Sequence, residues 1–470
     1  MTRASHPPSL LQRFCLLWLI PLLTPGNRPL TPPRLVRGRP SPILWTMRLP
    51  HPGSSQVRFA AEHAPFIAAL AATADSDAEQ TIRWQSLAAG LAVLHGIDVW
   101  ADEPMRSSYA WRNIAERVER LPESAPLREL LRAVAHSALI VGSRPAPSPL
   151  VPLMAYGRAL EADAEWSLAA DVYRTIADHA PAGDASDLVP SACQRLAYCC
   201  RVLGQLDAAD RAITAGRIAA REQQDAIADL WLRLSAANLI AHRGNLPAAA
   251  AALSGIVADA QVPDARPVLI AAWHDSGQVA IARGQYERAA LLCFAAAEAY
   301  PEPHQRCRAL SDLATAATAL GHWELARTVN EFLLAAAPGR EFRWTACINL
   351  LELAILEGRE TTFELYRQRL QHEPLPVALL ASYHLYTGRG YLRFGRRLLA
   401  RQALGRALGV ATGASLNQLR HLADTELTAL ERAEHADQQV PEPEPRRSEW
   451  SPAVDALVEG IDRLRAATVG

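Results

Sequence analysis

The chain has 470 residues, of which 50% are hydrophobic and 21% are charged, so it can bury one large core or two to three ordinary ones. Its 48 basic and 49 acidic residues leave a formal net charge of -1, and no overall positive charge attracts nucleic acid or anionic lipid. Every basic residue is arginine, which excludes a Walker-type phosphate loop and Schiff-base catalysis because both need a lysine amine.

Common catalytic motifs are also missing from the sequence. The seven cysteines form no C-x-x-C pair, and neither H-E-x-x-H nor G-x-S-x-G occurs. Gly388 and Gly390 miss the dinucleotide-binding spacing because Arg393 stands where the third glycine belongs. We therefore expect no enzyme activity, no cofactor and no metal. Scattered cysteines are typical of free thiols in a reducing compartment, which favours the cytoplasm.

Residues 1–46 are rich in proline and arginine and differ from the rest of the chain. Their one apolar run, residues 14–23, is shorter than the roughly 20 residues that span a bilayer, so no integral membrane span is expected. We expect a disordered or artefactual extension, with Met47 as the true start. The alternative is a secretory signal or tether, because Arg3 and Arg13 precede the apolar run; the protein would then be exported.

Residues 56–142 carry apolar residues at helical spacing, which predicts an N-terminal region of three or four helices. Pro122 and the proline-rich run 143–149 mark breaks in this region. The expected apolar faces are formed by Trp84, Leu87, Leu91, Leu94, Trp111, Ile114, Val118, Leu121, Leu127, Leu130, Leu131 and Val134.

Residues 149–412 repeat one pattern seven times: a helix, a turn and a second helix. The turn positions, at steps of 40, 40, 40, 37, 37 and 37 residues, are Ala164, Gly204, Gly244, Gly284, Gly321, Gly358 and Gly395. We expect a positive φ at these turns, which glycine adopts without strain. Because one helix pair cannot bury its apolar face alone, this period predicts an all-α fold, an α-α superhelix of stacked hairpins.

Small residues recur at fixed distances from each turn and predict close helix crossings. Seven residues before the turns stand Gly157, Ala197, Ala237, Gly277, Ala314, Leu351 and Gly388. Five residues after them stand Ala169, Ala209, Ala249, Ala289, Ala326, Phe363 and Ala400. Two residues after the turns, larger side chains are expected to fill the space between helices, namely Trp166, Leu206, Leu246, Tyr286 and Trp323.

This pattern resembles the tetratricopeptide repeat family. The fourth repeat carries the family motif almost completely, at Trp273, Ser276, Gly277, Ala280, Gly284, Tyr286, Ala289, Ala296 and Pro301. The resemblance covers about residues 150–409 and implies a right-handed solenoid of helical hairpins, in a bacterial protein whose period exceeds the usual 34 residues of the family. The sixth repeat departs from the motif at Leu351, Glu360 and Phe363, so we expect a wider helix crossing and a local change of curvature there.

Three segments follow the repeats. Residues 413–435 predict a helix that caps the last repeat, and residues 436–450 predict a stiff linker rich in proline and acidic residues. Residues 451–470 predict a short amphipathic helix that could fold back into a groove, dock on a partner or fray. Its expected apolar face is formed by Val454, Leu457, Val458, Ile461 and Leu464.

Clusters of chemically active residues have structural explanations. Cys193, Cys199 and Cys200 are expected to pack in the core rather than bind metal or act in redox chemistry. Adjacent residues on a helix point in different directions, so His274 and Asp275 are not expected to form an acid–base pair. We expect their side chains to lie at the surface or in a groove. The arginines within residues 389–406 predict a solvated face offset by acidic neighbours, and the alternative is a surface for an anionic partner.

In the tetratricopeptide repeat family the first helix of each repeat lines a concave groove, so the resemblance implies a partner-binding surface at the outward positions of these helices. Carried over position by position, these are Arg158, Tyr198, Arg201, Asn238, His274, Gln278, Arg308, Thr315, Glu352, Arg389 and Arg393. The clamp of that family for peptide C-terminal carboxylates uses lysines and asparagines, and only Asn238 fits it here. A chaperone co-factor of that type is therefore not expected.

The sequence as a whole predicts a non-enzymatic scaffold that binds a protein or peptide through a concave groove, without nucleic acid as a partner. Neither the partner nor the pathway nor the oligomeric state follows from the sequence. The alternative function is a ligand- or peptide-sensing regulatory repeat protein in bacterial signalling.

Overall fold

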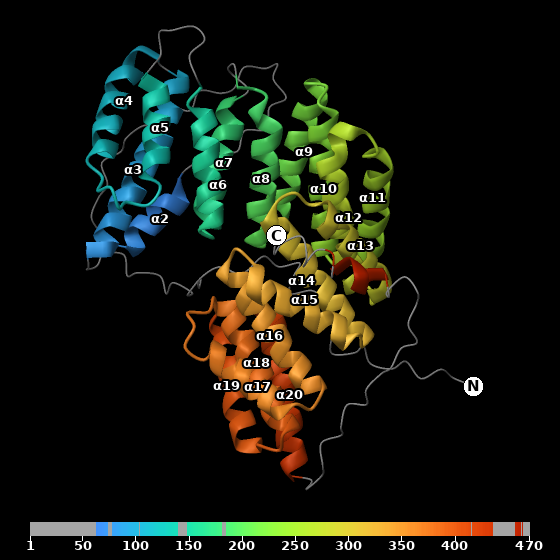
Figure 1. The fold of residues 1–470 in the computed structure, drawn as a ribbon. Coiled ribbons are helices and arrows are strands. Elements are labelled where there is room, and N and C mark those ends of the chain that lie inside the picture. The colour runs from blue at the N-terminus through green and yellow to red at the C-terminus, as the bar shows by residue number, and fades with distance from the viewer. Residues whose placement is uncertain are drawn as a thin grey trace. The chain divides into compact units, whose positions relative to one another are not determined.

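The computed structural model describes residues 63–73, 78–102, 104–139, 148–180, 185–414, 416–435, 456–461 and 463. The expected extension 1–46 and the expected linker 436–450 lie outside these ranges, as do Val454 and Leu464. Within the described ranges all regular structure is helical (Figure 1), which confirms the predicted all-α class. None of the helices in these ranges is long and apolar enough to cross a membrane.

The described residues form two compact units that divide between Leu232 and Arg233. The part up to Leu232 is called the first unit below, and the part from Arg233 the second unit. The helices of the first unit are α2 (Ala64–Ala72), α3 (Ala78–Asp102), α4 (Pro104–Glu119), α5 (Arg128–Leu139), α6 (Leu150–Ala162), α7 (Trp166–His179), α8 (Leu188–Val202) and α9 (Leu206–Glu222). The dividing position lies inside α10 (Ala226–His242).

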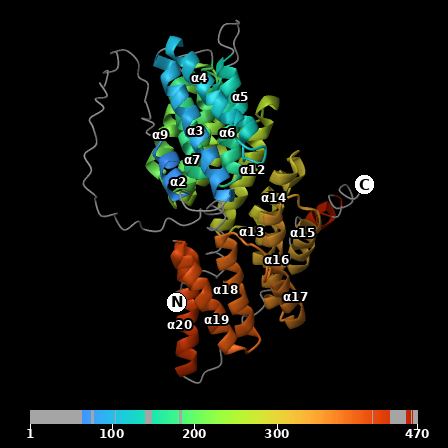
Figure 2. The same ribbon diagram turned by 90° about the vertical axis from the view of Figure 1, so that its left-hand side faces the viewer.

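The second unit continues with α11 (Leu246–Asp259), the 3₁₀ turn η3 (Pro263–Ala265), α12 (Arg266–Ala282), α13 (Tyr286–Ala299), α14 (Pro303–Leu320), α15 (Trp323–Ala336), α16 (Arg340–Leu356), α17 (Glu360–Leu370), α18 (Val377–Arg393), α19 (Arg397–Gly413) and α20 (Asn417–His435). Figure 2 shows α18, α19 and α20 side by side, and α20 contacts both of the other two helices. Its apolar side, at Leu419, Leu422 and Ala423, is buried in a core shared with α18 and α19. This is the packing expected of a helix that covers the last hairpin.

Four helices, α2 to α5, precede the hairpins, as the apolar spacing predicts. Trp111, Val118, Leu131 and Val134 of the predicted faces are buried. Trp84 differs from the expectation, because 43% of its surface is exposed. Its side chain therefore contributes little to the core that its neighbours in the pattern form.

The seven predicted turns all adopt the left-handed conformation, which confirms the prediction of a positive φ. The angle is 60° at Ala164 and lies between 68° and 88° at the six glycines. The amide that follows the turn bonds back to the carbonyl five residues earlier, as in Gln205 N to Cys200 O at 2.8 Å and Gln285 N to Ala280 O at 2.8 Å. This Schellman geometry satisfies the last carbonyls of the first helix and starts the second helix in an antiparallel direction.

Close crossings within the hairpins depend on the predicted small residues. All six alanines located five residues after a turn are completely buried. A Cβ atom at Gly277 would lie 2.5 Å from Sγ of Cys293, and one at Gly388 would lie 2.6 Å from Cγ of Leu404. These glycines are therefore needed for the approach of two helices, because a real Cβ does not reach such distances.

The sixth hairpin, α16 and α17, accommodates its unusual residues through the next hairpin. Leu351 and Phe363 are both fully buried. A Cβ at Gly390 of α18 would lie 2.0 Å from Cε2 of Phe363, so the absence of a side chain there makes room for the phenyl ring. Glu360 lies at the surface and pairs with Arg396. The expected change in curvature stays a prediction.

A short helical piece at residues 456–461 packs on the second unit. Leu457 and Ile461 are buried in a core cluster with Phe294 of α13. A Cβ at Gly460 would lie 2.1 Å from Cζ of Phe294, so this contact is close. Of the three possibilities that the sequence left open, the structure has the helix folded back, although its contact is with the second helix of a hairpin.

Candidate functional site

Most of the predicted groove residues occupy the same position in their hairpins. Six residues before each turn, on the first helix, stand Arg158, Tyr198, Asn238, Gln278, Thr315, Glu352 and Arg389. This set is called the inner row below. Arg158 is exposed and the other six are half-buried, so each can contact both its own protein and a molecule that lies on the surface.

In the second unit two side chains of the inner row form hydrogen bonds to the next hairpin. Asn238 Nδ2 donates to Asp275 Oδ2 at 2.7 Å, and Gln278 Nε2 donates to Asp312 Oδ2 at 2.9 Å. Both aspartates stand nine residues before their own turns, so the two bonds repeat one geometry. These side chains fix the spacing of consecutive first helices. Sequence reasoning missed Asp312 entirely.

His274 has a different place from the one predicted. It was expected at the surface or in a groove, but only 2% of it is exposed. Its Nε2 lies 2.8 Å from Asp312 Oδ2, the atom that also accepts from Gln278, and its ring meets Tyr300 edge-on. Because a buried polar group must be paired, His274 ties two hairpins together. His274 pairs with Asp312 and the adjacent Asp275 pairs with Asn238, so the two neighbours have different partners, as predicted.

Arg389 and Glu352 form the charged end of the inner row. Arg389 Nε donates to Glu426 Oε1 of α20 at 2.7 Å, and its guanidinium lies over the ring of Tyr386 at 5.1 Å from the centroid. Burial acts to lower the pKa of Arg389, but the carboxylate of Glu426 and neighbouring groups raise it above its ordinary value. Burial raises the pKa of Glu352, and the positive charge of Arg389 opposes this shift.

The remaining predicted residues of the second unit, Thr315, Arg308 and Arg393, each make a separate local contact. Thr315 Oγ1 donates to the carbonyl of Ser311 at 3.1 Å. Arg308 is half-buried and reaches Gln305 at 3.4 Å. Arg393 lies near a hairpin turn, since its Nη2 would be 3.5 Å from a Cβ at Gly358.

In the first unit the structure brings together two of the three predicted residues. The guanidinium of Arg201 lies over the ring of Tyr198, 5.3 Å from its centroid. The same ring meets Trp166 edge-on at 5.7 Å. This gives α8 an aromatic and cationic surface, while Arg158 extends from α6 into solvent.

The basic stretch near the end of the hairpins has acidic neighbours, as expected. Arg396 pairs with Glu360 and, at 2.9 Å, with Glu364, both on α17. Arg396 directly precedes α19, so these pairs connect the start of α19 to α17, and the bond from Arg389 to Glu426 connects α18 to α20.

A buried histidine and aspartate cluster in the first unit was not predicted. His63, 1% exposed, lies between two carboxylates, with Nδ1 3.0 Å from Asp171 Oδ2 and Nε2 2.9 Å from Asp98 Oδ2. His179 Nε2 contacts the other oxygen of Asp98 at 2.8 Å. His63 precedes α2 with φ of 47°, so the cluster ties the start of α2 to α3 and α7.

The two carboxylates determine the charge of His63. Burial acts to lower the pKa of His63, but its hydrogen bonds to the carboxylates of Asp171 and Asp98 raise the pKa to about 9. Burial acts to raise the pKa of Asp98, but His179 and His63 lower it to about 2. His63 is therefore a buried cation at neutral pH. No group of histidine, cysteine and acidic residues within the described ranges has an arrangement that could hold a metal ion.

The cysteines lie in the core, as predicted. The six within the described ranges are buried free thiols. Burial raises the pKa of Cys193 to about 12 and raises that of Cys200. Because the thiolate is the reactive species, these side chains act as small packing groups.

No family model and no curated protein matches this sequence. Among solved structures, the chain is similar to a tetratricopeptide repeat protein from Parabacteroides merdae, with 15% identity, 58% of this chain and 98% of the other covered, and a TM-score of 0.40. It is also similar to a Rap protein complexed with competence and sporulation factor, with 12% identity, 74% and 99% covered, and a TM-score of 0.41. On the geometry of its own turns and crossings, the chain is an all-α array of tetratricopeptide-like helical hairpins.

Proposed function

We propose that the chain is a non-enzymatic scaffold that binds a protein or peptide segment along the part of the inner row that lies in the second unit, from Asn238 to Arg389. The observation that carries this proposal is the recurrence of one polar or aromatic side chain at the same position of every hairpin, half-buried or exposed in each case. A row with the period of the hairpins suits a chain molecule, which presents peptide groups at regular intervals.

The bonds between hairpins support the same function. Asn238 and Gln278 each hold a neighbouring aspartate through the amide nitrogen. A primary amide has both donors and an acceptor, so these groups can also bond to the backbone of a partner. Because they are already held in place, little side-chain entropy is lost when a partner binds.

The chemistry of the described residues favours binding over catalysis. The buried cysteines retain their protons, and His274 and Asp312 serve contacts between hairpins. Catalysis needs a nucleophile or base beside an accessible cavity, and the inner row does not supply this combination.

Peptides selected from a random library on the full chain test this proposal. We expect Gln278→Ala, in the inner row, and Arg308→Ala, a predicted groove residue outside that row, to weaken binding of the selected peptides by about tenfold each, a typical loss at an interface anchor. Arg158→Ala applies the same test to the first unit. Arg288→Ala, an exposed arginine on α13, is the matched control and should bind normally.

Charge reversal at Arg389 is unsuitable for this test, because the new carboxylate would face Glu426 of α20 and repel it, whereas Gln278→Ala only removes one hydrogen bond between hairpins. Circular dichroism confirms that each variant is folded. If Arg288→Ala abolishes binding while the inner-row variants bind like the unmodified chain, the inner row is not the binding surface.

A further inference from the structure

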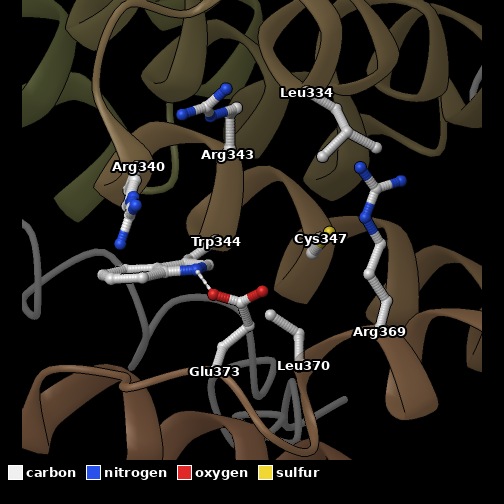
Figure 3. A pocket seen from close by; sticks show the side chains of 8 residues that line it. All are labelled: Leu334, Arg340, Arg343, Trp344, Cys347, Arg369, Leu370 and Glu373. Carbon is white, nitrogen blue, oxygen red and sulfur yellow. Dashed lines mark hydrogen bonds between the residues drawn. The ribbon is translucent and has the colours of Figure 1, made fainter.

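A cavity of about 400 Å³ lies at the sixth hairpin, among α15, α16 and α17 (Figure 3). The second helix of this hairpin is short, since α17 has 11 residues where α15 has 14 and α19 has 17. It ends at Leu370, which is one of the residues that line the cavity. The volume is in the range of small-ligand sites.

Three guanidinium groups line this cavity. Arg340 and Arg343 lie one turn apart on α16, and Arg369 comes from the last turn of α17. Within the described part of the chain none of the three has an ion-pair partner, whereas nearby Arg367 pairs with Glu364 at 2.7 Å. The cavity therefore has three arginines in its lining that no carboxylate of the described ranges pairs with.

The negative charge in the cavity is smaller than the positive charge. Glu373 is the one carboxylate among the lining residues, and it accepts a hydrogen bond from Nε1 of Trp344 at 3.0 Å (Figure 3). Arg340 is the first residue of α16, so the free amides at the start of that helix add positive potential. A site with this excess of positive charge attracts an anion.

One wall and the floor of the cavity are apolar. Cys347 and Leu370 are buried, and the half-buried side chains of Leu334 and Trp344 stand beside them. Burial raises the pKa of the Cys347 thiol to about 11, so it stays protonated and is not a nucleophile. The cavity can bind a molecule, and its thiol does no chemistry on it.

We propose that this cavity binds a small organic anion. Its phosphate or carboxylate group pairs with guanidinium groups of the lining, which suit such groups geometrically. Its apolar part rests on Trp344 and Leu334. This inference is independent of the inner row, and such a ligand would make the second unit responsive to a small molecule.

Calorimetric titration of the full chain with four probes tests the proposal: phenyl phosphate, phenylacetate, inorganic phosphate and benzyl alcohol. We expect an aryl anion to bind more tightly than inorganic phosphate, because it also uses the apolar wall, and benzyl alcohol not to bind. The comparison of phenyl phosphate with phenylacetate tells which anionic group the site prefers.

Four variants locate the binding. Arg343→Gln and Arg369→Gln should each weaken binding of the aryl anion by about tenfold. Glu373→Gln keeps an acceptor for Trp344 but removes the negative charge, and should strengthen binding. Arg420→Gln, an exposed arginine of α20, is the control and should leave the affinity unchanged.

A stability measurement separates binding from folding. Without an anion, Arg343→Gln should unfold at the same temperature as the unmodified chain or higher, because repulsion among the guanidiniums is reduced. At the same anion concentration, the unmodified chain, the control and Glu373→Gln should gain stability, and Arg343→Gln and Arg369→Gln should gain less than the unmodified chain. The proposal is overturned if no small anion binds, if the Arg343→Gln and Arg369→Gln proteins bind as well as the unmodified chain, or if only an acidic peptide binds.

Discussion

At the scale of single residues, the clearest consequence is a pH dependence at His63. Its pKa is raised to about 9 in the folded chain from an ordinary value near 6.5, so the stability it contributes is complete below about pH 6.5 and is lost as the pH rises through 9. Asp98 acts oppositely, because its pKa is lowered to about 2, and its contribution is lost only as the pH falls through that value.

We therefore expect the docking of α2 to weaken on the order of 2 kcal/mol between pH 6.5 and 9. Hydrogen exchange of the α2 amides measures this loss, after correction for the intrinsic exchange rate. His63→Gln should remove the pH dependence in this interval, whereas His136→Gln, a surface histidine of α5, should retain it. Nearby His95, whose pKa burial lowers, adds no charge in this range. An unchanged pH profile in His63→Gln would assign the effect to another group.

At the scale of elements, the helical piece at residues 456–461 depends on Gly460. A side chain there would meet the ring of Phe294, which is itself packed in the core. Leu457 and Ile461 are buried by this contact, and a buried aliphatic side chain contributes roughly 1.5–3 kcal/mol. We expect Gly460→Val to release the helix and to raise hydrogen exchange across residues 456–461.

Val458→Ala is the matched control, because 38% of Val458 is exposed and the helix should stay docked without it. Phe294→Leu combined with Gly460→Ala should restore part of the protection, since the smaller side chain leaves room for a Cβ. Protection that survives in Gly460→Val would show that the piece is held by contacts other than the one with Phe294.

At the scale of the whole molecule, hairpins stabilise one another through their interfaces. Ala289 lies at the crossing of α12 and α13 and is completely buried. Ala289→Phe should overpack this crossing and lower the free energy of unfolding by about 1–3 kcal/mol. Because the stability of stacked hairpins is coupled between neighbours, exchange should increase in α12, α13 and α14 and remain unchanged in α6 and α7.

Arg288→Phe places the same side chain one residue earlier, at an exposed position, and serves as the control in chemical denaturation. Equal midpoints for the two variants would mean that the assignment of the crossing position is wrong.

The sequence by itself determined the hairpins, because their signals are local. A glycine at six of the seven turns allows a positive φ, and alanines and glycines at fixed distances from the turns set most of the helix crossings. Ala164 follows the same rule without being glycine, since its position in the period identifies it. Burial of the cysteines followed from the same register.

The tertiary structure alone decided which residues meet across hairpins and helices. The partner of Gln278 is 34 residues away, and the two partners of His63 are 35 and 108 residues away, so the pairing depends on how the helices stack. His274 illustrates the difference, because its outward position on the helix is covered by the next hairpin. The arginine-lined cavity likewise depends on how α15, α16 and α17 pack, because its lining residues come from all three helices and from Glu373 beyond them.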